Sequence, residues 1–243
     1  MQTAESGKVY LTGAGPGDPD LLTVRARDLL ATADVILHDG LVVDEILELA
    51  SPTARVESVA KRAGEKSVTQ QEIEERMIRE ARDGQSVIRL KVGDPMLFGR
   101  GAEEIGALEA AGVPYEVVPG VTAALAAAAA LACPLTARDT SAAVVMLSGH
   151  RAGSGTGNDR SLAPPGGFAE ATLAIYMPGS DYAGLASDLT EGGVAADTPC
   201  AVISQCSLPG QQVIRLTVAE LPAHSALPAP ALVMVGKVLE AAR

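Results

Sequence analysis

The stretch VYLTGAGPGD, residues 9–18, places a short apolar run directly before a glycine-rich turn. The apolar run predicts a β-strand that stops at Gly13, and the glycines after it predict a tight turn that needs positive φ angles. The turn has the spacing GxGxG rather than GxGxxG, Pro16 has no N–H group to offer a phosphate, and Asp18 would repel one. The turn therefore argues against a nicotinamide dinucleotide and favours a neutral or cationic ligand.

Outward from this turn, short apolar runs alternate with amphipathic stretches along the first half of the chain. In one of them Ile73 and Met77 lie on the same side of a charged helix, and Gly84 ends it. Strands and helices that alternate at this length imply a parallel sheet with right-handed crossovers. The predicted strands are residues 9–11, 35–37, 56–59, 86–92 and 115–118, and the predicted helices are 21–33, 70–82, 101–111 and 121–132.

The second half has more strand and fewer helices. Its predicted strands are residues 144–147, 173–177, 200–204, 213–216 and 232–235, and its predicted helix is 182–189. We therefore expect an α/β protein with two different α/β domains, residues 1–119 and 120–243, divided near Pro119-Gly120. Residues 151–167 are rich in Gly, Ser and Pro, which predicts a surface loop.

Charge and composition exclude several classes of protein. The net charge is -11, from 30 acidic and 19 basic residues, and only 2% of residues are aromatic. A nucleic-acid binder normally shows the opposite charge balance and stacking aromatic side chains, so we expect no nucleic-acid partner. No apolar run reaches the ~20 residues of a membrane span, and residues 1–8 lack the apolar core of a signal peptide.

The cysteines and histidines predict neither a disulfide nor a metal site. Cys133, Cys200 and Cys206 form no CxxC pair, so we expect reduced thiols in a cytoplasmic protein. The three histidines are scattered and form no HxxxH or His/Cys cluster, which predicts that no metal is bound.

A second glycine-containing segment, VGDPMLFGRG at residues 92–101, follows a predicted strand. Together with three further motifs it resembles the tetrapyrrole methylase family. Within that family, the stretch KRAG at residues 61–64, followed by Ser67, is similar to the members that methylate uroporphyrinogen III. The further motifs are GAGPGD at residues 13–18, PGVTAA at 119–124 and PLTARD at 134–139, and the likeness extends to PALVMVG at 230–236.

The resemblance implies two α/β domains with the active site in the cleft between them, and a homodimer. It implies that S-adenosylmethionine binds as co-substrate and leaves as S-adenosylhomocysteine. The implied reaction is methylation of uroporphyrinogen III at C2 and C7, through precorrin-1 to precorrin-2, which feeds sirohaem, cobalamin or haem d1 synthesis.

The resemblance also implies two catalytic residues, Asp39 as proton acceptor and Lys61 as proton donor. Taken alone, Asp39 before Gly40 is more typical of a solvated turn than of a catalytic site, and most lysines lie at the surface. The family match favours the catalytic interpretation, because the reaction has no need of an activated Ser or Cys but does require proton transfer.

The remaining implied residues bind ligands. Asp94 is expected to hold the amine of S-adenosylmethionine, and Thr122-Ala123 its carboxylate at a helix N-terminus. A protein of net charge -11 needs local arginines to hold a substrate with eight carboxylates. The implied cofactor-binding residues are Pro16, Val92, Gly93, Asp94, Leu97, Thr122, Ala123, Met177 and Cys206; the implied substrate-binding residues are Arg100, Glu103 and Arg138.

The sequence departs from the family pattern at several places near these residues. Gly40 stands where Arg is usual, His38 replaces Tyr, Val92 replaces Gly and Met96 replaces Phe, and residues 205–207 replace Asn-Gly-Thr. Two alternatives therefore stay open: a C-methyltransferase of the same fold that acts on another precorrin, or a relative that binds tetrapyrrole or S-adenosylmethionine without catalysis.

Overall fold

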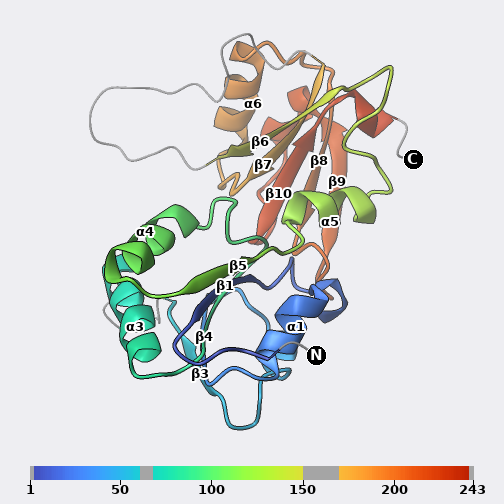
Figure 1. Ribbon diagram of the computed structural model, residues 1–243. Coiled ribbons are helices and arrows are strands. Elements are labelled where there is room, and N and C mark those ends of the chain that lie inside the picture. Colours follow the sequence, from blue (N-terminus) through green and yellow to red (C-terminus); the bar gives the residue numbers. More distant parts are fainter. Residues whose placement is uncertain (1–2, 61–67, 150–169, 241–243) are drawn as a thin grey trace. The chain divides into compact units, whose positions relative to one another are not determined.

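The computed structural model describes residues 3–60, 68–149 and 170–240 (Figure 1). The chain forms two compact units, residues 1–122 and 123–243. The sequence places the division after Pro119, three residues earlier. The predicted surface loop at 151–167 lies outside the described residues, as does Lys61.

The first unit contains a sheet of five strands that all run parallel, in the order β3-β2-β4-β1-β5. Parallel pairing is what the alternation of strands and helices predicts, so the α/β interpretation of this half is confirmed. The strands are β1 (Val9–Gly13), β2 (Val35–His38), β3 (Arg55–Ser58), β4 (Val87–Lys91) and β5 (Tyr115–Val118).

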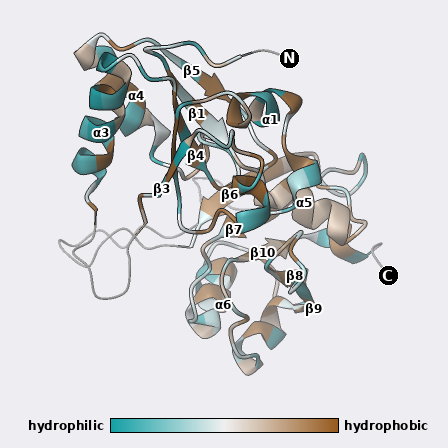
Figure 2. Cartoon of the chain, turned by 90° about the horizontal axis from the view of Figure 1, so that it is seen from below, coloured by the Kyte–Doolittle hydropathy of each residue, from teal (hydrophilic) through white to brown (hydrophobic). Residues whose placement is uncertain are grey.

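Helices cover both faces of this sheet (Figure 1). Helix α1 (Val24–Leu30) packs Leu29 and Leu30 against one face, and α3 (Gln70–Arg82) with α4 (Gly101–Ala111) cover the other. Ile73 and Met77 of α3 lie in the core as their spacing predicts, and α3 shows both hydrophobic and hydrophilic residues in Figure 2. The short helix α2 (Asp44–Leu47) and the 3₁₀ turn η1 (Pro19–Leu21) complete the unit.

The predicted helix 21–33 is shorter than expected, and the reason is local. Leu22 and Thr23 have extended backbone, and the Thr23 hydroxyl accepts a hydrogen bond from the amide of Ala26 at 3.1 Å. Thr23 is therefore an N-cap, a role in which threonine competes with helix continuation. The helix begins at Val24 and ends at Leu30.

The second unit contains a mixed five-stranded sheet in the order β6-β7-β10-β8-β9, with only β6 and β7 parallel. Its strands are β6 (Ala143–Ser148), β7 (Ala171–Tyr176), β8 (Pro199–Ser204), β9 (Gln212–Thr217) and β10 (Ala231–Val235); its helices are α5 (Ala123–Ala130), α6 (Tyr182–Glu191) and the 3₁₀ turns η2 (Val218–Ala223) and η3 (Lys237–Glu240).

Alternate side chains of the second sheet face different helices. Ala174 of β7 packs in one cluster with residues of α5, whereas Leu173 and Ile175 pack in another with residues of α6. The sheet therefore lies between helices, as the first one does. None of the helices in the described part of the chain is long and apolar enough to span a membrane.

Candidate active site

The loops that follow β1 and β4 lie side by side at the carboxyl edge of the first sheet. The two strands are neighbours, yet the chain leaves β1 for α1 on one face and β4 for α4 on the other. Such a switch point opens a crevice outside the carboxyl ends of parallel strands, which is where ligands bind in open α/β sheets. The Pro16 turn and the Gly93 loop both lie there.

Glycines join these loops to the segment after β5. The amide of Gly15 donates to the carbonyl of Gly93 at 3.2 Å, and the amide of Gly93 donates back at 2.8 Å. A Cβ at Gly13 would lie 2.6 Å from the Cα of Gly120, and a Cβ at Gly120 would overlap the carbonyl oxygen of Gly93. We call Gly13, Gly15, Gly93 and Gly120 the glycine junction; three loops meet there at backbone contact.

The carboxylate of Asp94 ties the glycine junction together. One oxygen accepts the amide of Met96 at 2.8 Å, and the other accepts the amide of Gly120 at 3.0 Å. The sequence predicts that this carboxylate holds a ligand amine, which stays a prediction. The contacts give Asp94 a second role, because it connects the loop after β4 to the segment after β5.

Asp39 lies directly after β2, one residue beyond the strand end, at the same edge of the sheet. Its carboxylate accepts a hydrogen bond from the guanidinium of Arg89, and its side chain is 34% exposed. His38 Nδ1 lies 2.9 Å from the carbonyl oxygen of Asp39. A Cβ at Gly40 would lie 2.5 Å from the Cβ of Ala60, so the chain is crowded immediately after Asp39.

Arg89 belongs to a buried set of charges that the sequence analysis did not single out. Its Nε donates to Glu104 at 2.9 Å, and Lys91 Nζ donates to the same Glu104 oxygen at 3.0 Å. We call Arg89, Lys91 and Glu104 the buried charge set. The signal was present in the sequence, because two cations two residues apart interrupt an otherwise apolar strand.

The pKa of Lys91 lies below its ordinary value. Burial of the ammonium is the main cause, the nearby charge of Arg89 adds to it, and Glu104 opposes both. Among the described residues, the second carboxylate oxygen of Glu104 is buried without a hydrogen-bond partner. The buried charge set is therefore held mainly by one shared carboxylate oxygen.

Arg100 and Glu103, both predicted to bind substrate, contact each other. Arg100 precedes α4 in the left-handed conformation, with φ of 57°, and its Nε donates to Glu103 at 2.9 Å. This hydrogen bond raises the pKa of Arg100 and lowers that of Glu103. The side chain of Arg100 is 57% exposed and that of Glu103 is 50% exposed, so a substrate carboxylate can reach the guanidinium.

The other predicted residues of the first unit lie on the same loops. Pro16 is buried, Leu97 is half-buried with its amide donating to the carbonyl of Asp94 at 3.3 Å, and Val92 directly follows β4. Thr122 is buried at the end of the unit, close to Gly93. The first unit thus brings together most of the predicted site, while Lys61 lies outside the described residues.

In the second unit, Ala123, Met177 and Cys206 lie at one edge of the sheet. Met177, predicted to be the last residue of a strand, directly follows β7, which ends one residue earlier at Tyr176; it has φ of 49° and is 44% exposed. The hydroxyl of Tyr176 accepts the amide of Ala124 at 3.1 Å, which brings the first turn of α5 to this edge. Cys206 follows β8 at the same edge, and burial raises the pKa of its thiol.

Arg138 lies at the opposite edge of that sheet. It sits in a turn closed by two hydrogen bonds of 2.9 Å between Ala137 and Ser141, and the Ser141 hydroxyl lies 2.9 Å from that of Thr172 at the start of β7. Met177 follows the other end of β7, about 17 Å from Thr172 at ~3.3 Å per residue. The second unit therefore does not bring Arg138 to the edge that carries Met177, and its substrate-binding role stays a prediction.

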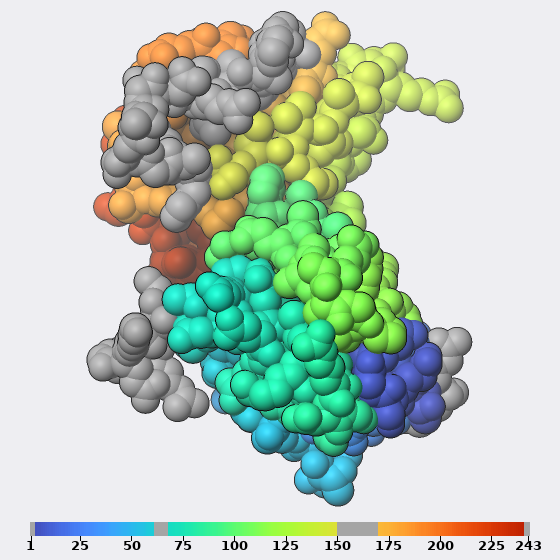
Figure 3. All heavy atoms as spheres, turned by 60° about the vertical axis from the view of Figure 1, so that its left-hand side comes forward, coloured from blue at the N-terminus to red at the C-terminus, as the bar shows by residue number. Residues whose placement is uncertain are grey.

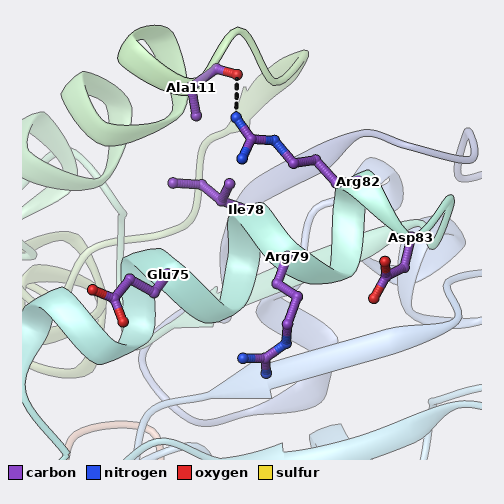
Figure 4. Close-up of a pocket in the computed structure, with 6 residues that line it drawn as sticks. All are labelled: Glu75, Ile78, Arg79, Arg82, Asp83 and Ala111. Atoms are coloured by element: carbon purple, nitrogen blue, oxygen red, sulfur yellow. Dashed lines mark hydrogen bonds between the residues drawn. The ribbon is translucent and has the colours of Figure 1, made fainter.

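A surface hollow of about 450 Å³ lies apart from these loops, between α3 and the end of α4 (Figure 4). Ile78 and Arg82 point toward Ala111, and Arg82 donates to the Ala111 carbonyl at 3.0 Å. The arginine thereby caps the carboxyl end of α4. Because α3 and α4 lie at the surface in Figure 3 and the hollow contains none of the predicted site residues, we interpret it as structural.

No group of three or more His, Cys, Asp or Glu side chains within the described ranges is arranged to hold a metal ion. The titratable side chains that gather at the carboxyl edge of the first sheet are paired with cations or with backbone amides instead.

Comparison with known proteins gives consistent matches. The model of the tetrapyrrole (corrin/porphyrin) methylases matches residues 8–222. Siroheme synthase 1 of Klebsiella pneumoniae is 44% identical over 238 residues, which is 97% of this chain and 50% of that protein. The chain thus spans about half the length of the curated relatives it matches.

Two solved structures cover nearly the whole chain. Uroporphyrin-III-C-methyltransferase from Thermus thermophilus is 41% identical with a TM-score of 0.80, covering 96% of this chain and 94% of that one. The Thermus thermophilus enzyme complexed with S-adenosylhomocysteine is 36% identical, also with a TM-score of 0.80, covering 96% and 93%.

Proposed function

Since the chain belongs to the tetrapyrrole (corrin/porphyrin) methylase family, we propose that it methylates uroporphyrinogen III with S-adenosylmethionine. Two transfers, at C2 and C7, would give precorrin-1 and then precorrin-2, and each would release S-adenosylhomocysteine. The observation that carries this proposal is the 41% identity, over 96% of the chain, to a uroporphyrin-III-C-methyltransferase.

The glycine junction suits S-adenosylmethionine better than a dinucleotide. Gly93 is buried with φ of 68°, a conformation that glycine adopts readily, and a Cβ there would lie 3.9 Å from the Cα of Thr122. Pro16 offers no N–H group to a pyrophosphate. In the first unit, the residues proposed to bind S-adenosylmethionine are Pro16, Val92, Gly93, Asp94, Leu97 and Thr122. In the second unit they are Ala123, Met177 and Cys206.

S-adenosylmethionine supplies an electrophilic methyl group, whose bond to sulfur breaks as an electron-rich ring carbon attacks. The protein's contribution is largely orientation of the two reactants, which is worth about 7–11 kcal/mol in well-aligned systems. Protons must also move as the ring bonds shift. We propose that Asp39 accepts a proton and that Lys61 donates one.

The substrate-side arginines give a testable division of roles. Replacing Arg100 or Arg138 by Ala is expected to raise the KM for uroporphyrinogen III about tenfold, the scale of one lost hydrogen bond to a charged group. The affinity for S-adenosylhomocysteine, measured by calorimetry, is expected to stay unchanged. Arg79→Ala, on the exposed face of α3, is the control. An equal loss of affinity for uroporphyrinogen III and for S-adenosylhomocysteine would contradict this division.

The experiment that tests the function is anaerobic incubation of the protein with S-adenosylmethionine and uroporphyrinogen III, with the tetrapyrroles analysed by mass. A gain of two methyl groups is expected. A gain of one would show that the second transfer is blocked. If no methyl group is gained although S-adenosylhomocysteine still binds, another precorrin is favoured as the substrate. A separate titration with NAD(P)H that shows no binding would exclude a reductase.

We also propose that the protein acts as a homodimer in the cytoplasm, which is what the family resemblance implies. Exposed apolar side chains such as Leu125 on α5 are compatible with a protein partner. Light scattering at micromolar concentration is expected to give twice the monomer mass of 24.7 kDa. A measured mass equal to that of the monomer would contradict the proposed dimer and would leave the proposed reaction unaffected.

A further inference from the structure

Asp39 and the buried charge set form a group of four charged side chains, three of which are almost fully removed from solvent. The side chains of Arg89, Lys91 and Glu104 are 3%, 4% and 0% exposed, whereas Asp39 is 34% exposed. Two cations face two carboxylates, so the group is balanced in charge. Burial of such a group carries a desolvation cost that apolar side chains on β4 would avoid. Its presence therefore calls for a role other than stability.

The guanidinium of Arg89 is fixed by its surroundings. Its Nε donates to Glu104, and Nη1 donates at 3.3 Å to the carbonyl oxygens of Leu37 and Leu90. Because the guanidinium is planar, these contacts determine where the remaining nitrogen points. That nitrogen, Nη2, donates to Asp39.

This hydrogen bond joins Arg89 to the carboxylate of Asp39. Asp39 lies in the loop after β2, and its side chain is the only one of the four that reaches solvent. Glu104 reaches Arg89 from α4, through Nε of the guanidinium rather than through Nη2. The line of contacts therefore runs from a buried carboxylate on α4 to a carboxylate at the sheet edge.

We propose that Arg89 is a positioning residue for Asp39 and that Glu104, paired with Lys91, holds Arg89 in place. The inference rests on the proposed function and deepens it, since Asp39 is the proposed proton acceptor. Arg89 itself does not touch the substrate. It sets the direction of a carboxylate whose alignment with the ring carbon determines the rate of proton transfer.

The test is Arg89→Lys in the full chain. Lysine keeps the charge but cannot donate in several directions within one plane. The kcat for methylation is expected to fall by about 10²-fold, the scale of a misplaced catalytic group. The KM for both substrates and the Kd for S-adenosylhomocysteine are expected to change little. Arg25→Lys, which alters an arginine paired with Glu116 at 3.0 Å in the same unit, is the matched control and is expected to leave kcat unchanged.

A double substitution separates positioning from structural support. In an Asp39→Asn background, Arg89→Lys is expected to cost little more in kcat, because two changes that act through one group are not additive. The inference would be overturned if Arg89→Lys lowered kcat in the Asp39→Asn background by the same factor as in the unaltered protein. It would also be overturned if Arg89→Lys alone left kcat unchanged.

Stability and the proposed function are checked in the same series. If Arg89→Lys melts below the assay temperature, Glu104→Gln carries the test, since the neutral amide takes away the carboxylate that Arg89 and Lys91 share and so loosens Arg89. The same fall in kcat with unchanged KM is expected. An unchanged kcat for Glu104→Gln would overturn the role of Glu104. Absence of methylation by the unaltered protein would overturn the proposed function and this inference with it, whereas failure confined to the variants overturns the inference alone.

Discussion

Replacement of Asp39 by Asn is expected to slow methyl transfer by a factor of about 10² to 10⁴. The carboxamide keeps an oxygen that can accept the hydrogen bond from Arg89, but it cannot take up a proton from the tetrapyrrole. Asp39 follows β2 and does not belong to the glycine junction, so binding of S-adenosylhomocysteine is expected to stay unchanged. The substitution thus isolates proton transfer from cofactor binding.

Initial rates with uroporphyrinogen III under anaerobic conditions measure the first effect, and calorimetry measures the second. Asp44→Asn is the matched control, because Asp44 lies exposed on α2, five residues further along the chain. A rate for Asp39→Asn close to that of Asp44→Asn would show that Asp39 has no part in proton transfer.

Gly120→Ala is expected to lower the free energy of unfolding by about 3 kcal/mol and to abolish binding of S-adenosylhomocysteine. The added methyl group would overlap the carbonyl of Gly93 and lie 2.9 Å from the Cα of Gly13. Both obstacles are backbone atoms, which cannot rotate away, so the cost falls at the upper end for overpacked sites. Relief requires the three loops of the glycine junction to separate.

Denaturant unfolding and calorimetry measure these two effects. Gly106→Ala is the control, because Gly106 lies exposed in α4 with no atom within 4 Å of the added methyl group. In a helix interior this change is expected to stabilise the protein by roughly 0.5–1 kcal/mol. Similar stability for the two variants would mean that the loops of the glycine junction move apart freely.

The sequence predicts best those elements that depend on near neighbours. The helix 70–82 has the predicted bounds, since Thr69 and Glu72 form a capping box at its start and Ile73 and Met77 repeat at helical spacing. The helix 101–111 and the strand 115–118 also have their predicted bounds. In each case the deciding residues lie within a few positions of one another.

Contacts between distant residues are beyond such reasoning. Arg89 and Asp39 are 50 residues apart, and Asp94 and Gly120 are 26 apart. The sequence places Asp39 at a strand end but cannot show which buried cation will face it. It likewise presents Asp94 as a ligand for an amine, while the fold engages both its oxygens with backbone amides.

Arg138, predicted to bind substrate, shows that a residue's place in the fold is harder to predict than its motif. A motif can be identified without knowing which edge of a sheet its loop will occupy. The contact of Ser141 with Thr172 places this loop at the start of β7, whereas Met177 follows the other end. That assignment depends on the direction of β7 in a mixed sheet, which residue spacing does not encode.

The contact between Gly40 and Ala60 has a consequence for how this protein can change over generations. A Cβ at residue 40 would lie 2.5 Å from the Cβ of Ala60. An arginine, the residue that the family pattern has after the aspartate, would therefore force Ala60 or the backbone to move. A change of Ala60 to glycine would remove this obstacle, and an arginine at residue 40 would then add a second cation beside Asp39, which Arg89 already contacts.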